Sequence, residues 1–501
     1  MEAAGRVKLD KWGYEVKTTS DACISSINAY YEQVLSYGRR RSVILEAPIH
    51  DPNCVLANML ACQFLCSSDP CRAPFHLQAA KSLLEHATSY ERAVFDAIIC
   101  LISPERDDDV TIESHFKCLG ISFLAFAQHS SDIVRRLQLL KHFPKDLVSL
   151  TRAQVLAFYM GRPDLSLELV QQVLPMNENE NYIYGLLAFP LLELGRMADA
   201  EKAARLGYEI NKEDPWVQHA LCHVFQYECR FKEAVEFMQE CSQSWGSLSS
   251  FMITHNWWHV ALCYLEGHSS VEKVRQVYDQ HIWKELERSD AIKAEVYLNA
   301  VALLLRVYVR GEINVFEDRL KILAGCLADQ AFWYLEWHLD LLTLWALTCT
   351  GESAKAEELL KGLRARHSMM TKKKQHSMQR GMMLAEALYK YGKGEDKQAL
   401  ELLGPDFDAI NCKIIGASDE QVDVFNEVFY VMLLNTGQAV KAIEVIEKQL
   451  KKREGAPFLW RLLERSYAML GKQEARIVGE KASALEAAYF NKLEKQPDPV
   501  A

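Results

Sequence analysis

Two pairs of histidines stand at a spacing that would let each pair bind one ligand. His219 and His223 lie four residues apart in DPWVQHALCHVFQYE, and His255 and His259 repeat that spacing in THNWWHVAL. Residues four apart on a helix are neighbours, with Cβ atoms roughly 5–6 Å apart, so both imidazoles can reach a common point. Since packed helices have axes about 8–10 Å apart, the two pairs could converge on one site.

Three interpretations of these histidines stay open. They could be packing residues beside Trp216, Trp257 and Trp258. They could bind a divalent metal such as zinc or iron, because H-x-x-x-H on a helix is a spacing that zinc enzymes use and imidazole suits these ions. They could also grip an anionic or peptide ligand without a metal. An unsatisfied buried imidazole costs on the order of 1–3 kcal/mol, so a cluster of four favours a site over packing alone.

The elements that carry the histidines are predicted to be helical hairpins. The stretch YIYGLLAFPLLELGRMADAEKAARLGYEINKEDP has the pattern of a helix, a glycine turn, a second helix and a short loop. Repeats begin near Leu147, Asn181 and Pro215, in steps of about 34 residues, which is the tetratricopeptide period. Weaker repeat starts follow near Ile253, Trp337, Arg380, Asp423 and Pro457.

This periodicity predicts an all-α fold, a tetratricopeptide-type right-handed solenoid of helical hairpins whose first helices line a concave groove. Residues 1–146 are helical without a clean register and are predicted to form an irregular N-terminal capping region. Residues 147–490 are predicted to form one continuous solenoid, and residues 491–501 a flexible C-terminal tail. No Gly-, Ser- or Pro-rich linker divides the chain.

Composition narrows the class of protein. The chain has 501 residues, 49% of them hydrophobic, and its net charge of −10 disfavours nucleic acid as a partner. The 14 cysteines are scattered through apolar stretches without a CxxC pair, which predicts reduced thiols. With neither a signal peptide nor an apolar stretch that could span a membrane, we expect a cytoplasmic protein. The usual nucleotide-binding and serine-hydrolase motifs are absent from the sequence.

The repeat that begins at Pro215 places its polar residues on one face. Leu221, Cys222 and Phe225 are the predicted core positions, and the other face is predicted to look into the groove. The predicted groove residues from this helix and the next are Trp216, His219, His223, Gln226, His255, Trp258 and His259. The basic segment 361–380 is interpreted as a solvated helix end and loop, with docking of an acidic partner as the alternative.

Five stretches of the chain resemble the tetratricopeptide repeat protein 38 family: DPWVQHALCHVFQ, EAVEFMQ, HNWWHVALCYLE, VYDQHI and DVFNEVFYVMLL. That family carries H-x-x-x-H followed about 36 residues later by H-N-x-W-H, and its function is largely uncharacterised. The resemblance covers roughly residues 150–450 and implies a helical scaffold with a histidine cluster.

The resemblance adds three site positions. A D-x-H element of the family matches WYLEWHLDL, which places His338 with the pairs and Glu336 where the aspartate would stand. Two carboxylates of the family are replaced, one by Gln226 and one by Asn299, which implies altered or lost acid–base chemistry. We expect at least three of the five histidines to converge, with Gln226 and Asn299 at the rim.

The leading functional hypothesis is therefore binding of a protein or small-molecule ligand in the groove. The alternative is a divalent-metal-dependent or histidine-based enzyme that uses His219, His223, His255, His259 and His338. The sequence leaves open which ligand binds, whether the protein is an enzyme, and the oligomeric state.

Overall fold

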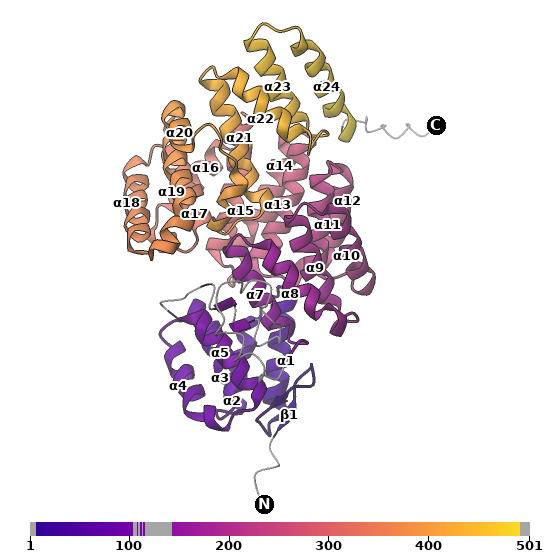
Figure 1. Cartoon of the computed structure of the whole chain (residues 1–501), viewed down its shortest axis with the longest axis vertical. Helices are drawn as coiled ribbons and strands as arrows, with labels where there is room; N and C mark the ends of the chain where they lie inside the picture. Colours follow the sequence, from indigo (N-terminus) through magenta and orange to yellow (C-terminus); the bar gives the residue numbers. More distant parts are fainter. Residues whose placement is uncertain (1–6, 104–107, 109–110, 113, 116–142, 491–501) are drawn as a thin grey trace, which may run out of the picture. The chain divides into compact units, whose positions relative to one another are not determined.

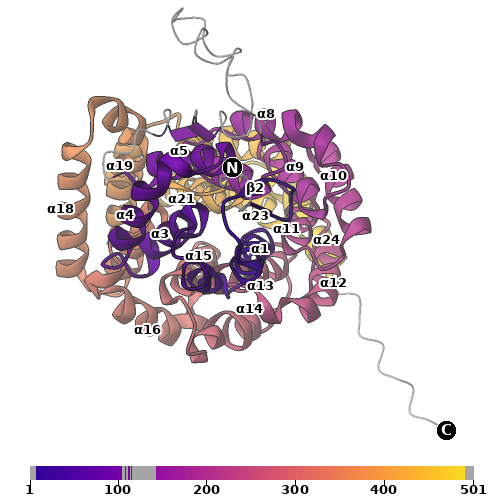
Figure 2. The same ribbon diagram turned by 90° about the horizontal axis from the view of Figure 1, so that it is seen from below.

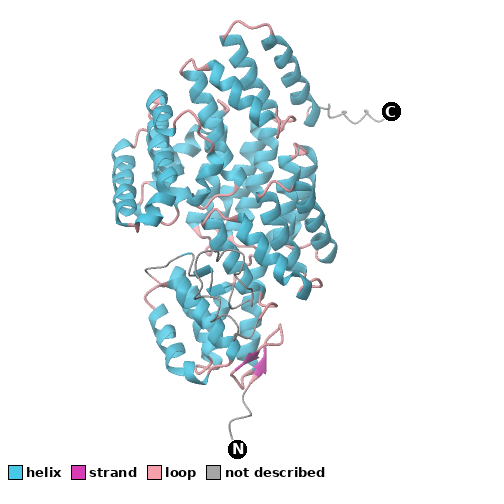
Figure 3. Ribbon diagram, viewed as in Figure 1, coloured by secondary structure: helices cyan, strands magenta, loops and turns pink. Residues whose placement is uncertain are grey.

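Helices joined by short turns make up nearly all of the described chain. The computed structural model describes residues 7–103, 108, 111–112, 114–115 and 143–490, so the predicted tail and part of the predicted capping region lie outside it. Within these residues the strands are β1 (Lys8–Leu9) and β2 (Glu15–Val16), which pair antiparallel (Figure 3). The prediction of an all-α hairpin fold is confirmed. No helix of the described residues is both long and apolar enough to cross a bilayer.

Contacts between Cα atoms divide the chain into two compact units, residues 1–220 and 221–501. The boundary falls inside helix α11 (Pro215–Tyr227), which runs through it without a break. That the hairpins of 147–490 form one continuous array stays a prediction.

The first unit consists of a helical N-terminal part and the first regular hairpins. In the hairpins α7 packs on α8, α8 on α9 and α9 on α10 (Figure 1). Tyr31, Tyr90 and Leu147 belong to one apolar core, so the N-terminal helices and the hairpins share an interior. The helices are α1 (Asp21–Leu35), α2 (Ala47–His50), α3 (Val55–Ser68), α4 (Ala73–Leu83), α5 (Ser89–Ile102), α7 (Leu147–Tyr159), α8 (Pro163–Val173), α9 (Asn181–Glu193) and α10 (Met197–Ile210).

The second unit is a series of hairpins from α12 to α24. Segment 361–380 covers the end of α18 and the start of α19, and its role stays open. The helices are α12 (Phe231–Cys241), α13 (Ser250–Glu266), α14 (Val271–Val277), α15 (Lys293–Val309), α16 (Glu317–Leu327), α17 (Trp337–Cys349), α18 (Ser353–Met369), α19 (Lys372–Gly392), α20 (Asp396–Leu403), α21 (Asp419–Asn435), α22 (Ala439–Leu450), α23 (Pro457–Met469) and α24 (Glu474–Tyr489).

Helix α15 lies at the centre of the second unit. It packs on α13, on α17 and on α21, although more than a hundred residues separate α15 from α21 along the chain. Figure 2 shows α14, α16 and α18 on the outside of the series, with α13 and α15 toward its interior. Helix α15 therefore joins helices from distant parts of the sequence.

Turns between paired helices need a left-handed residue. Gly195, in the predicted glycine turn, has a φ of +74°, and two further hairpin turns have Gly351 with φ of +88° and Cys229 with φ of +60°. This conformation costs residues with a Cβ roughly 1–2 kcal/mol, whereas glycine adopts it freely. The predicted glycine turn is therefore confirmed, and the turn at Cys229 adopts the same conformation without glycine.

Substitution by alanine should separate this turn requirement from helix propensity. No atom lies within 4 Å of a Cβ added at Gly351 or at Gly325, and Gly325 lies inside α16. We expect Gly351→Ala to lower the free energy of unfolding by about 1 kcal/mol, because φ is positive there. Gly325→Ala should raise it by about 0.5–1 kcal/mol. Urea unfolding measures both, and equal effects would contradict the assignment of the turn.

Candidate metal centre

Three imidazole rings of the second unit converge in its interior. We call His223 of α11 with His255 and His259 of α13 the histidine centre. The ring centroids of His223 and His259 are 4.4 Å apart, and those of His255 and His259 are 4.9 Å apart. The side chains are 5%, 3% and 0% exposed, respectively. The expected convergence is observed, but in a buried space rather than in an open groove.

His219 lies one turn before His223 on the same uninterrupted helix. One ring nitrogen from each of His223, His255 and His259 lies within 4.8 Å of the other two, whereas His219 belongs to the first unit. Its ring also stacks on Trp216 at 4.9 Å, and Trp216 stacks on Tyr37 at 5.0 Å. Trp216 is therefore part of an aromatic stack in the first unit rather than a free groove residue.

Two buried amides fix the orientation of the histidines on α13. Asn299 of α15 donates its amide hydrogens to Thr254 Oγ1 and to the Glu295 carbonyl, so its oxygen faces His255 and accepts from Nδ1 at 2.8 Å. Gln226 donates to a carboxylate oxygen of Glu266, so its own oxygen accepts from Nδ1 of His259 at 3.0 Å.

These hydrogen bonds place the proton of both rings on Nδ1 and the lone pair on Nε2. The expectation that Gln226 and Asn299 stand at the rim is wrong, because each is 1% exposed. They are the residues that hold the rings.

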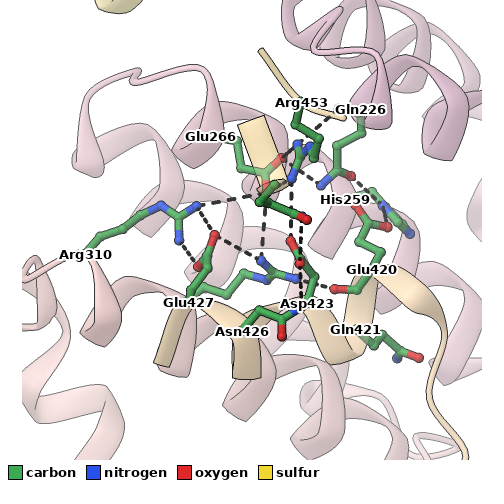
Figure 4. A network of polar contacts seen from close by, with 12 residues as sticks. Gln226, His259, Glu266, Arg310, Glu420, Gln421, Asp423, Asn426, Glu427 and Arg453 are labelled. Carbon is green, nitrogen blue, oxygen red and sulfur yellow. Dashed lines mark hydrogen bonds and ion pairs between the residues drawn. The ribbon is translucent and has the colours of Figure 1, made fainter. Parts of the chain in front are cut away.

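A carboxylate that the sequence analysis missed reaches the same rings. Glu420, in the first turn of α21, has its Oε2 atom 3.0 Å from Nδ1 of His223 and 3.2 Å from Nδ1 of His259. Figure 4 shows this side chain directed toward His259. The centre thus combines imidazole nitrogens with one carboxylate, although both expected family carboxylates are replaced.

Behind the histidine centre lies a buried charge cluster, which we define as Glu266, Arg306, Arg310, Glu420, Asp423, Glu427 and Arg453. Arg453 donates to both oxygens of Glu266, at 3.3 and 2.7 Å, and to the carbonyl of Gln226. Arg310 makes a two-pronged pair with Glu427, at 2.6 and 2.9 Å. Arg306 lies between Glu266 and Glu427 and donates to the backbone carbonyl of Glu420.

The pKa shifts follow from burial and from these charges. Burial lowers the pKa of His223 to about 3 and that of His255 to about 4, so both rings are neutral at pH 7. Burial alone would raise the pKa of Glu266, but Arg453, Arg306 and Arg310 lower it to about 2. Burial, followed by the charge of Glu266, raises the pKa of Glu420 well above its ordinary value.

Three predicted site residues remain. Trp258 and His338 are buried, and Glu336 is half-buried. Trp258 is buried and stacks on His255 at 5.2 Å. His338 of α17 is buried close enough to His255 for the charge of His255 to act on its pKa. Glu336 is the half-buried N-cap residue of α17, and its charge acts on Asp340 of the same helix.

A signal for the charge cluster is present in the sequence. Glu420, Asp423 and Glu427 follow one another at helical spacing in DEQVDVFNEVF, and Arg306 and Arg310 stand four apart in LLLRVYVR. Charges that share one face of an otherwise apolar helix predict a buried polar network. The sequence does not say which helices these faces meet.

No protein-family model matches the chain. Solved structures that it resembles include human IFIT1 as a dimer with m7Gppp-AAAA, at 13% identity over 94% of this chain and 91% of that chain, with a TM-score of 0.37. A monomeric IFIT1 mutant with Gppp-AAAA is 12% identical over 93% of this chain and 96% of that chain, with a TM-score of 0.40. The assignment to the tetratricopeptide-like superfamily rests on the helices and turns of this chain.

Removal of Arg453 should destabilise the protein far more than removal of a surface arginine. Arg453→Met deprives the buried Glu266 of its two-pronged partner, and breaking a buried pair costs about 3–5 kcal/mol. Arg476→Met is the control, because Arg476 pairs with Glu480 on the surface, where such pairs contribute about 0–1 kcal/mol. Urea unfolding compares the two, and equal losses would contradict a stabilising role for the cluster.

Proposed function

We propose that the second unit binds one divalent transition-metal ion at the histidine centre, zinc or iron by its donor set, and that the chain is a metal-dependent enzyme. The observation that carries the proposal is the convergence of His223, His255 and His259, with ring nitrogens within 4.8 Å of one another.

The spacing of the nitrogens suits an ion. Donor atoms around a tetrahedral zinc lie roughly 3.3 Å apart when the bonds are about 2.0–2.1 Å long. The observed limit of 4.8 Å means that the rings need to close by little more than an ångström to reach this geometry. Metal-bound histidines also donate their second ring nitrogen to an oxygen acceptor, which is the role that Gln226 and Asn299 have here.

The charge balance favours a cation as well. The buried charge cluster has four carboxylates and three guanidinium groups, so it has one excess negative charge when all are ionised. Among the described residues no guanidinium group pairs with the side chain of Glu420, the carboxylate nearest the histidines, and Arg306 donates to its backbone carbonyl instead. Burial raises the pKa of Glu420, and a divalent cation bound nearby would favour its ionised form and would remove that excess.

The chemistry supported by this donor set is activation of a small molecule next to a base. A bound divalent ion lowers the pKa of a water molecule that it binds. Glu420 lies within hydrogen-bond distance of the histidine nitrogens and would accept or return a proton beside them. Gln226 and Asn299 would orient the rings without taking part in proton transfer.

Burial makes this proposal stronger than binding of a protein ligand at these residues. A protein ligand needs exposed side chains, whereas the three histidines are at most 5% exposed. We further propose that the chain belongs to the tetratricopeptide repeat protein 38 family, whose two histidine motifs here meet in one centre. The described cysteines are free thiols, as expected in a reducing compartment such as the cytoplasm.

Metal analysis tests the proposal directly. Protein produced without a histidine tag should retain about one equivalent of zinc or iron, measured by mass spectrometry of the elements after dialysis. The double variant His255→Leu with His259→Leu should retain under about a tenth of an equivalent and keep its helical circular dichroism. His268→Ala is the control, because that side chain is 57% exposed, and it should bind metal normally. Wild-type protein that stays metal-free after supplementation would refute the proposal.

The amide that orients His255 should affect metal affinity without being a ligand. Asn299→Leu removes the acceptor for Nδ1 and should weaken binding of zinc about 10- to 100-fold, as loss of such orienting groups does. Asn299→Asp keeps an oxygen acceptor of the same shape and should stay close to the wild type. Competition with a chromophoric chelator measures both affinities. Equal affinities for the two variants would exclude this role for Asn299.

A further inference from the structure

A cavity of about 240 Å³ in the second unit shares no residue with the histidine centre. One side of it is formed by Arg380 and Met383 of α19, and the other by the loop that leads from the end of α20 to α21. At roughly 30 Å³ per water molecule, this volume has room for an organic molecule of about ten non-hydrogen atoms. The cavity is thus large enough for a small ligand.

Packing on α21 holds the loop side of the cavity in place. The ring of Phe407 lies 5.4 Å from the ring of Phe429, measured between centroids. The side-chain oxygen of Asn426 accepts a hydrogen bond from the backbone N–H of Ala409 at 2.9 Å. Gly404, which lines the cavity, has φ of +78° and ψ of +168°, a conformation that essentially only glycine adopts and that is common at ligand-binding sites. The loop is therefore fixed before any ligand binds.

Much of the lining can contact a hydrocarbon group. Met383, Leu403 and Phe407 line the cavity, and Leu403 is 8% exposed. The thiol of Cys412 lines it as well, but burial raises the pKa of this thiol to about 12, so it stays protonated at pH 7 and is a poor nucleophile. These side chains suit binding of an apolar group rather than its chemical modification.

The charged groups around the cavity leave one positive charge over. The carboxylate of Asp408 lies 3.5 Å from Nζ of Lys448, and that of Asp406 lies 3.8 Å from Nζ of Lys441. The guanidinium group of Arg380 makes no ion pair with another described residue, so it can bind a ligand without breaking one. A guanidinium group presents its N–H donors in a fork that fits the two oxygens of a carboxylate.

We propose that this cavity binds a small apolar monocarboxylate, whose carboxylate pairs with Arg380 and whose hydrocarbon part contacts Met383, Leu403 and Phe407. The inference goes beyond the proposed function and does not depend on the metal site. The same chemistry is present in a free carboxylic acid and in an apolar residue at the C-terminus of a peptide. Arg380 is the last residue of the basic segment 361–380, so the proposal also gives one residue of that segment a role.

Titration of the full chain with phenylacetate tests the inference, with phenylacetamide as a neutral probe of nearly the same shape. Ligand-observed NMR should show saturable binding of phenylacetate with a Kd that is roughly millimolar, as its size allows. Phenylacetamide should bind about 10-fold more weakly, because a hydrogen bond to a charged group is lost. Arg380→Met should weaken binding of phenylacetate by a similar factor and leave that of phenylacetamide unchanged, and Arg380→Lys should restore part of the affinity.

Variants of Met383 test the cavity itself. Met383→Trp should fill it and abolish binding of both probes, whereas Met383→Leu, which nearly conserves the volume, should keep the wild-type affinities. Arg476→Met is the control for loss of a surface arginine outside the cavity, and it should bind phenylacetate as the wild type does.

A short peptide with a C-terminal phenylalanine separates the two sources of the carboxylate. Tighter binding of this peptide than of phenylacetate, lost when its C-terminus is amidated, would support a peptide end as the ligand, and weaker binding would support a free acid. The inference is wrong if phenylacetate does not bind, if it binds no better than phenylacetamide, or if Arg380→Met binds it normally. Arg380 is exposed, so this last comparison stays valid even if Met383→Trp fails to fold.

Discussion

The interior of the second unit depends on Glu266, a buried carboxylate at the end of α13. Arg453 holds both of its oxygens, Arg306 lies 3.8 Å away, and Gln226 donates to it. Burying a carboxylate without a partner costs a large free energy, so the guanidinium groups must be buried with it. The single side chain therefore ties α13 to α15, to the turn after α22 and to α11. The position of His259 follows from it, because the amide that Glu266 orients is the one that accepts from the ring.

Gln226 and Asn299 stand where the resemblance implies carboxylates. As buried amides they can still orient the histidine rings. A buried amide has no charge to neutralise, and it accepts from an imidazole as well as a carboxylate does. Gln226 and Asn299 therefore fix the rings without adding negative charge to a region that already has one carboxylate in excess. The carboxyl group that contacts the rings comes instead from Glu420, whose helix lies in a different part of the sequence.

The sequence predicts the local features of this protein better than the distant ones. The 34-residue step and the glycine turn predict the hairpins, and H-x-x-x-H at 219–223 and 255–259 predicts the converging rings. These features depend on residues that are close together or in adjacent repeats. Glu420 and Arg453 could not be placed in the same way, since Glu420 is 114 residues from Arg306 and Arg453 is 187 residues from Glu266. The prediction that these histidines line an open groove was wrong. A repeat pattern identifies the inner face of a helix, but it does not identify what covers that face.

Helix α21 covers the inner faces of α13 and α15. A repeat architecture can enclose a site in this way. Each hairpin of a regular array touches only its neighbours, so its inner face stays open to solvent. Here α21 packs on α15, beyond the nearest-neighbour pattern, and brings Glu420, Asp423 and Glu427 against the inner faces of α13 and α15. Closing a long segment of chain costs entropy that grows only slowly with its length. Several buried pairs with well-aligned guanidinium groups can offset that cost, provided that their charges are nearly balanced. The contact that closes the array also brings the carboxyl group of Glu420 to the histidines.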